Sequence, residues 1–178
     1  MRETIQGGAS VSQRRSHRSF VSYIDRSREY YAAQGYRQPY AWAYHQDVPF
    51  TLLGKPLSQC RVGLVTTADR AKPEGDNEEA RRVMREPYAM ASDPAPKSLF
   101  TQDLAWDKDA THTEDVDSFL PLHRLAEFAG QGRIGSVSRR FYGVPTHYSQ
   151  GKTLGRFAPQ LLAWCREDGV DAVLLSAL

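Results

Sequence analysis

The chain has 178 residues, of which 40% are hydrophobic and 25% are charged, so it can bury one hydrophobic core but not two. Its formal net charge of +2 gives no strong field for attracting nucleic acid or a membrane surface. No segment approaches the roughly 18 consecutive apolar residues of a membrane span, and the N-terminus lacks the apolar stretch of a secretory signal. We therefore expect a cytoplasmic protein without membrane or nucleic-acid partners.

The N-terminal region, residues 1–48, is predicted to be a basic, aromatic-rich extension of the main domain. Residues 1–40 carry seven arginines against three acidic residues. Apolar residues recur at helical spacing from Phe20 to Tyr31, which predicts a short helix closed by Gly35. The residues that follow are crowded with aromatic rings and prolines, which is typical of irregular chain.

The main domain, residues 49–178, is predicted to begin its regular structure at residue 61. Residues 61–68, "RVGLVTTA", form a short apolar run rich in β-branched residues, which predicts a strand followed by a loop over residues 69–77. Residues 78–86 favour a weak helix. Residues 87–113 contain three prolines and scattered charges, so we expect no regular structure there.

The last third of the chain alternates helical and strand patterns. Helices are predicted over residues 121–130 and 155–169, and strands over residues 133–143 and 170–178, the last one buried on both faces. This alternation predicts βαβ units and hence a parallel sheet. We expect an α/β domain with a three-layer α/β/α, Rossmann-like arrangement that is incomplete at its C-terminus.

Three segments carry a resemblance to a known family. They read "PLSQCRVGLVTTADRAK", "DVDSFLPLHRLAEFAGQGRIGSVSRRFYG" and "PQLLAWCREDGVDAVLLSAL", and the pairing of "FLPLHRL" with "GRIG" is the most specific part. In this order they resemble the selenoprotein B family, the substrate-cleaving subunit of the glycine, sarcosine, betaine and D-proline reductases. The resemblance implies reductive cleavage of a carbon–nitrogen bond in an amino acid or betaine-type substrate. It also implies other reductase subunits or a thiol electron donor as partners, and is compatible with a homo-oligomer.

The resemblance places the nucleophile, a selenocysteine or cysteine, in the loop directly after the strand "VDAVLLSAL". No catalytic residue is therefore expected within the 178 residues, and the selenocysteine takes the place of a cofactor. We expect Leu178 to be followed in the gene by a UGA codon meant for selenocysteine; a fragment or a degenerate gene is the alternative. The two thiols are poor substitutes, because Cys60 precedes a strand and Cys165 points from a helix into the core.

Candidate substrate-binding residues follow the predicted strands. In α/β sheets ligands bind beyond the carboxyl ends of the strands, where Thr66 and Thr67 end the first one. The sequence "GVPTHYSQGK" follows another strand and offers His147, Tyr148 and Lys152 at the same edge. The family commonly has a Gly/His-containing turn after the first strand where this chain has "DRAKPEG", which puts substrate contacts there in doubt. For the threonines, an ordinary role as β-formers is the alternative.

Two further candidates lie in the acidic segment "THTEDVDSF". His112 and Asp117 are expected to border the substrate in one interpretation; in the other, Asp117 or Ser118 caps the next helix. The spacing matches no metal motif, and the two cysteines form neither a disulfide framework nor a zinc pattern, so we expect no metal site. "GQGRIG" follows a helix and precedes a strand, the reverse of the dinucleotide-binding order.

Two other functions remain open from the sequence alone. The same α/β platform without a nucleophile would be a non-catalytic module that binds a small zwitterion or a partner subunit. A weaker alternative uses the basic, aromatic N-terminus to contact nucleic acid. In either case we expect the 178-residue chain itself to be inactive as a reductase.

Overall fold

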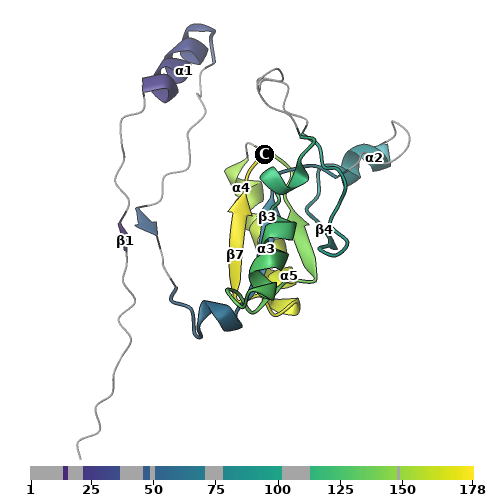
Figure 1. Cartoon of the computed structure of the whole chain (residues 1–178). Coiled ribbons are helices and arrows are strands. Elements are labelled where there is room, and N and C mark those ends of the chain that lie inside the picture. Colours follow the sequence, from purple (N-terminus) through teal and green to yellow (C-terminus); the bar gives the residue numbers. More distant parts are fainter. Residues whose placement is uncertain are drawn as a thin grey trace, which may run out of the picture. The chain divides into compact units, whose positions relative to one another are not determined.

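The structure, a computed structural model, describes residues 14–15, 22–36, 46–48, 51–70, 78–101, 113–147 and 149–178. It divides the chain into two units, Met1–Leu52 and Leu53–Leu178, which are described separately (Figure 1). Within the described residues, no helix is both long enough and apolar enough to cross a membrane.

The first unit contains the predicted short helix. Helix α1 spans Ser22–Ala33, and Gly35 follows it with a φ of +86°, a conformation that suits glycine. The amide of Tyr36 donates to the carbonyl of Tyr31 at 3.2 Å, which closes the helix end. Strand β1, Arg14–Arg15, pairs antiparallel with β2, Asp47–Val48.

The second unit is built on a sheet in which β3, Arg61–Thr66, is central. Strand β7, Ala172–Ser176, pairs parallel with β3 along one side. On the other side β3 pairs parallel with β5, Ser136–Val137, near its start and with β6, Arg140–Gly143, near its end. Strand β4, Tyr88–Ala91, joins β6 antiparallel. The described part of the chain thus forms a mixed, mostly parallel five-stranded sheet, and the α/β class is confirmed.

Two helices of this unit lie where the sequence predicts them, and the last helical segment begins at Gln150 rather than at the predicted residue 155. Helix α2 spans Glu78–Val83 and α3 spans Leu122–Gly130. A continuous helical segment begins with α4, Gln150–Lys152, passes through a π-helical turn at Thr153–Phe157 and ends as α5, Ala158–Glu167. Short 3₁₀ turns lie at Leu57–Gln59 and Val116–Ser118.

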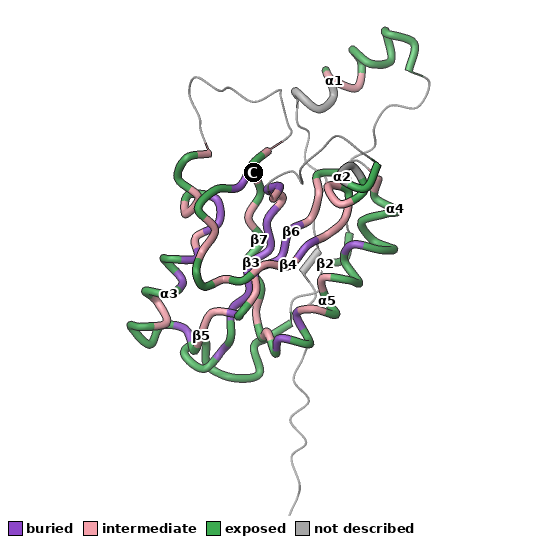
Figure 2. Tube along the Cα trace, turned by 90° about the vertical axis from the view of Figure 1, so that its right-hand side faces the viewer, coloured by how far each residue is buried: buried purple, intermediate pink, exposed green. Residues whose placement is uncertain are grey.

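The buried side chains form two clusters against β3. Figure 2 shows buried residues along β3 and β6. Val62 and Leu64 pack in one cluster with Leu122 and Leu125 of α3. Val65 packs in the other with Tyr142 and Cys165, supported by Leu161 and Trp164 of α5. Both cysteines are buried, as predicted, with Cys60 directly before β3 and Cys165 within α5.

Strand β4 corrects the prediction that residues 87–113 lack regular structure. Tyr88 is buried in β4 opposite Gly143 of β6, and its ring meets Phe141 edge-on with centroids 6.2 Å apart. A side chain at position 143 would overlap the Tyr88 ring, so glycine is required there. The predicted strand over residues 133–143 is in fact two strands, because the chain leaves the sheet at Ser138–Arg139. Residues 102–112 lie outside the described residues.

Strand β7 forms where the sequence predicts it, but the prediction that it is buried on both faces is wrong. Val173, Leu174 and Leu175 are 41%, 44% and 75% exposed. Within the described residues β7 pairs only with β3, which leaves it at an edge of the sheet (Figure 1). A run of hydrophobic residues predicts that a strand forms, whereas the burial of that strand depends on which elements lie beside it.

Candidate functional site

The carboxyl ends of three parallel strands meet at one edge of the sheet. Thr66, the last residue of β3, pairs with Gly143 at the end of β6 and with Ser176 at the end of β7. The amide of Val144 donates to the carbonyl of Thr66 at 2.9 Å, which holds the loop after β6 beside β3. The three segments that leave the sheet here therefore start side by side.

The two predicted threonines act differently at this edge. Thr66 is buried, and its Oγ1 accepts a hydrogen bond from the amide of Ala68 at 3.1 Å, so its hydroxyl stabilises the turn. Thr67 holds Leu178: the Leu178 amide donates to Oγ1 at 2.9 Å, and Oγ1 donates to the Leu178 carbonyl at 3.1 Å. Leu178 also packs against the larger hydrophobic cluster. The backbone that leaves β7 is thereby fixed next to the end of β3.

His147 and Lys152, two of the predicted residues after β6, lie together. The Nδ1 atom of His147 accepts from the amide of Ser149 at 2.9 Å, and its ring meets Phe157 edge-on. Nε2 of His147 lies 3.2 Å from Nζ of Lys152, and the ammonium of Lys152 can only donate in this contact. Both side chains are exposed, so the positive charge of Lys152 is accessible to an anionic group beside His147. Tyr148 lies outside the described residues.

The carboxylate of Asp117 caps the start of helix α3. Its Oδ1 accepts from the amide of His123 at 2.9 Å, and its carboxylate lies 3.6 Å from Nε of Arg124. This is the capping arrangement that the sequence offered as the alternative to substrate contact. His112, its predicted companion, lies outside the described residues.

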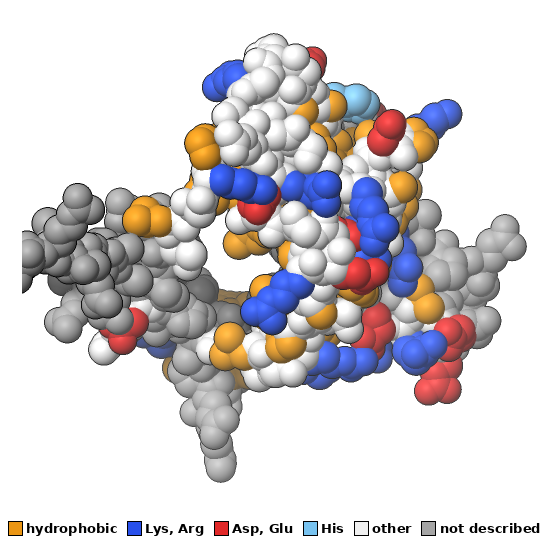
Figure 3. All heavy atoms as spheres, turned by 90° about the horizontal axis from the view of Figure 1, so that it is seen from below, with side chains coloured by type: hydrophobic (Ala, Val, Ile, Leu, Met, Phe, Trp, Pro, Cys, Tyr) orange, Lys and Arg blue, Asp and Glu red, His pale blue; other side chains and the backbone are white. Residues whose placement is uncertain are grey.

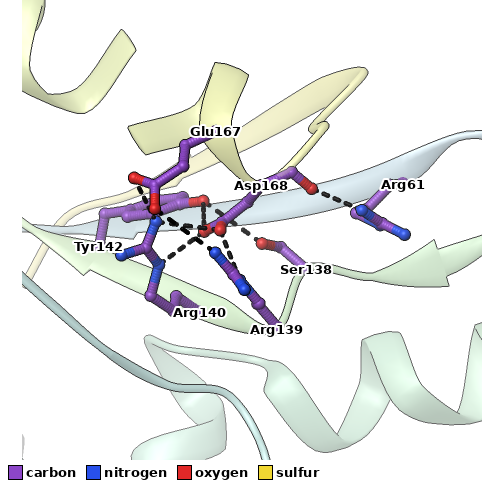
Figure 4. A network of polar contacts seen from close by, with 7 residues as sticks. All are labelled: Arg61, Ser138, Arg139, Arg140, Tyr142, Glu167 and Asp168. Carbon is purple, nitrogen blue, oxygen red and sulfur yellow. Dashed lines mark hydrogen bonds and ion pairs between the residues drawn. The ribbon is translucent and has the colours of Figure 1, made fainter. Parts of the chain in front are cut away.

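A polar cluster that the sequence does not reveal surrounds Asp168, just after α5 (Figure 4). Its carboxylate is completely buried and accepts four hydrogen bonds: from Nε of Arg139 at 2.7 Å, from Nε and Nη2 of Arg140 at 2.8 and 2.9 Å, and from the Tyr142 hydroxyl at 2.6 Å. The exposed Glu167 contacts both arginines at 3.5 and 3.0 Å. Nη1 of Arg61 donates to the Asp168 carbonyl.

The electrostatics of this cluster favour the charged form of Asp168. Burial alone would raise the pKa of the carboxyl, but the hydrogen bonds from Arg140, Tyr142 and Arg139 outweigh it and lower the pKa to about 2. Burial, and then the bond to Asp168, raise the pKa of the Tyr142 hydroxyl. Asp168 is therefore ionised at neutral pH.

The Asp168 cluster lies at the opposite edge of the sheet from the threonines. Arg61 and Arg140 are the first residues of β3 and β6, so the cluster ties the end of α5 to the starts of two strands. Figure 3, which views this side of the molecule, shows Lys and Arg side chains interleaved with Asp and Glu. Its position away from the carboxyl edge, together with its saturated hydrogen bonding, makes it a structural clamp.

Two residues at the carboxyl edge carry no recognisable signal in the sequence. The hydroxyl of Tyr88 donates to the carbonyl of Ala68 at 2.5 Å, and burial, followed by the nearby charge of Asp69, raises its pKa. Nη2 of Arg70 donates to the carbonyl of Val83 at 3.0 Å, and the guanidinium lies over the Tyr88 ring. Both residues shape the turn after β3.

Among the described residues no group of three or more His, Cys, Asp or Glu side chains could hold a metal ion. No protein family model, curated protein or solved structure matches this chain.

Proposed function

We propose that this chain forms the substrate-binding part of a reductase subunit similar to selenoprotein B, acting on an amino acid or betaine-type substrate. The observation that supports it most is the contact between Thr67 and Leu178. This contact fixes the backbone leaving β7 at the carboxyl edge, and the resemblance puts the nucleophile directly after such a strand. A selenocysteine or cysteine following Leu178 would then enter the space beside Thr66 and the loop after β6.

The substrate carboxylate is recognised, in this proposal, by His147 and Lys152. The ammonium of Lys152 offers a positive charge and N–H donors to this carboxylate, and the imidazole of His147 lies 3.2 Å from it. Both groups are exposed, so a carboxylate reaches them without any rearrangement of the core. Glycine, sarcosine, betaine and D-proline share this carboxylate next to the carbon whose bond to nitrogen is cleaved.

The cleavage itself requires a nucleophile that the described thiols do not supply. Cys60 is buried before β3, at the amino edge, and burial raises the pKa of the Cys165 thiol within α5. In the proposed reaction the selenolate or thiolate after Leu178 bonds to the carbon beside the carboxylate. The carbon–nitrogen bond breaks as the amine leaves with the electron pair and takes up a proton, and a thiol donor supplies the two electrons that release the product.

We also propose that the second unit has three layers. A three-layer, Rossmann-like α/β/α arrangement is supported by the packing of β3, since Leu64 contacts the α3 cluster and its neighbour Val65 contacts the α5 cluster. We also propose a cytoplasmic location, and other reductase subunits as the partners that the resemblance implies.

Titration of the 178-residue chain with betaine and glycine tests the binding step. We expect binding to weaken at least tenfold in the double variant His147→Ala, Lys152→Met, and to remain in Lys97→Met, which removes an exposed lysine elsewhere. Equal affinity in both variants would contradict the assignment of the carboxylate site.

A second function, a non-catalytic module that binds a small zwitterion, is favoured by the burial of both cysteines. It shares the carboxylate site and differs in the nucleophile. The coding sequence after codon 178 separates the two, because the reductase requires a selenocysteine or cysteine codon there with a homologous reading frame beyond it, whereas the binding module does not.

A further inference from the structure

The outer edge of β7 combines three properties that rarely occur together on a soluble surface. None of the seven side chains from Ala172 to Leu178 is charged. Val173, Leu174 and Leu175 are 41%, 44% and 75% exposed. In the described part of the chain β7 pairs on one side only, so the backbone N–H and C=O groups that point away from β3 are available to another strand. Edge strands are commonly protected by charges, prolines or bulges, and none of these interrupts β7.

The exposed apolar surface continues on both faces of the strand. Val173 and Leu175 point to one face and Leu174 to the other, because side chains alternate along a strand. On helix α5, Glu167 contacts Arg139 and Arg140 on the β6 side of the sheet. Leu162 precedes Glu167 by five residues, about 140° around the helix, and is 50% exposed. It therefore lies on the flank of α5 that faces the β7 side.

The amino end of β7 adds a neutral polar boundary. Nζ of Lys55 lies 2.8 Å from Oδ2 of Asp171, one residue before the strand, and the two charges cancel. The ion pair also places Lys55 near this edge, and two residues later Leu57 is 48% exposed. The edge is thus an apolar strip with no net charge to repel an identical strip.

We propose that β7 pairs antiparallel with β7 of a second copy of this chain, so that the two sheets join into one. A two-fold axis at Leu174 places this residue opposite its own counterpart and Val173 opposite Leu175 of the other copy. Each pair then lies on one face of the joined sheet, and the same residues contribute from both chains, as a two-fold interface requires. The pairing satisfies the free backbone groups of β7 and covers its apolar side chains.

A second copy fits this edge better than an extended peptide does. A single peptide strand would satisfy the backbone groups of β7 but would leave Leu162 of α5 and the two faces of the strand largely uncovered. A second copy brings the same strand together with its own flanking helix. It also needs no charge partner, which agrees with the absence of charge along residues 172–178.

Sedimentation of the 178-residue chain tests the proposal. We expect the wild type to have twice the 20.1 kDa mass of one chain. Leu174→Arg and Leu174→Glu should each be monomeric, since the two-fold axis sets like charges opposite each other. An equal mixture of these two variants should recover the dimer, because arginine then faces glutamate. Leu175→Lys, at the most exposed position of the strand, should also weaken the dimer.

The control is Ala91→Glu, which adds the same charge to an exposed position of β4, the strand at the far end of the sheet. It should stay dimeric, and circular dichroism should show that all variants remain folded. A monomeric wild type would overturn the proposal, as would a Leu174→Glu variant that stays dimeric. If the mixture of the two Leu174 variants remains monomeric, the pairing at Leu174 is wrong.

Discussion

Replacing Asp168 with asparagine tests the clamp at the amino edge of the sheet. The substitution keeps the size of the side chain but removes the charge that accepts bonds from Arg139, Arg140 and Tyr142. The amide of the asparagine offers only one acceptor oxygen, and its NH₂ group faces the N–H and O–H donors of these three residues. Breaking a buried ion pair costs roughly 3 to 5 kcal/mol. Arg139 is largely exposed and Arg140 keeps Glu167, so we expect the lower end, a loss of about 3 kcal/mol at pH 7.

The pH dependence provides an independent check of the same clamp. The pKa of Asp168 is lowered from an ordinary value near 3.8 to about 2 in the folded protein. A lowered folded-state pKa contributes stability that is fully present above the unfolded pKa and lost as the pH falls through the folded pKa. The shift corresponds to about 2 kcal/mol, so the stability gap between wild type and Asp168→Asn should shrink by that amount between pH 5 and about pH 2.

Urea denaturation followed by circular dichroism measures both effects. Glu167→Gln is the matched control, because Glu167 contacts the same two arginines but is exposed, and its loss should cost less than about 1 kcal/mol. Equal stability of Asp168→Asn and Glu167→Gln at pH 7 would refute the structural role of Asp168. A stability gap that stays constant from pH 5 down to pH 2 would contradict the lowered pKa.

Three further predictions follow from the sheet and its core. Gly143→Ala should destabilise the protein by about 3 kcal/mol, because the added methyl overlaps the ring of Tyr88; a melting temperature equal to that of the wild type would disprove this contact. Thr67→Val should speed hydrogen exchange at the Leu178 amide and cost about 1 to 2 kcal/mol, with exchange in the middle of β3 unchanged as the control. Both cysteines should resist a thiol reagent until urea unfolds the chain, since they are buried and burial raises the pKa of Cys165; rapid labelling of the folded protein would contradict this.

Local patterns in the sequence predict most of the fold. The apolar spacing of Leu122 and Leu125 predicts α3, and both side chains are buried as that spacing requires. The β-branched run at the start of the domain predicts β3. Strand β4 is missed because its four residues, Tyr88–Ala91, become a strand only through pairing with β6, some fifty residues later. Such a short segment carries too little pattern of its own.

The functional features are harder to predict, because they depend on residues that the fold brings together. Asp168 is read from the sequence only as the end of a helix, yet its partners lie 28 and 29 residues earlier. The contact between Thr67 and Leu178 spans 111 residues. The pair His147 and Lys152 is separated by only five residues, and both lie in the one segment that the sequence singles out after this strand.

Release of ammonia or an amine from glycine, sarcosine or betaine, or opening of the D-proline ring, tests the proposed function most directly. The polypeptide to assay is the gene product read past codon 178, with cysteine at the first position, in the presence of a dithiol. We predict carbon–nitrogen cleavage of one of these substrates, loss of cleavage when that cysteine is changed to serine, and no cleavage by the 178-residue chain. Turnover by the 178-residue chain alone, or no turnover by the longer product with any of the four substrates, would contradict the proposed reductase.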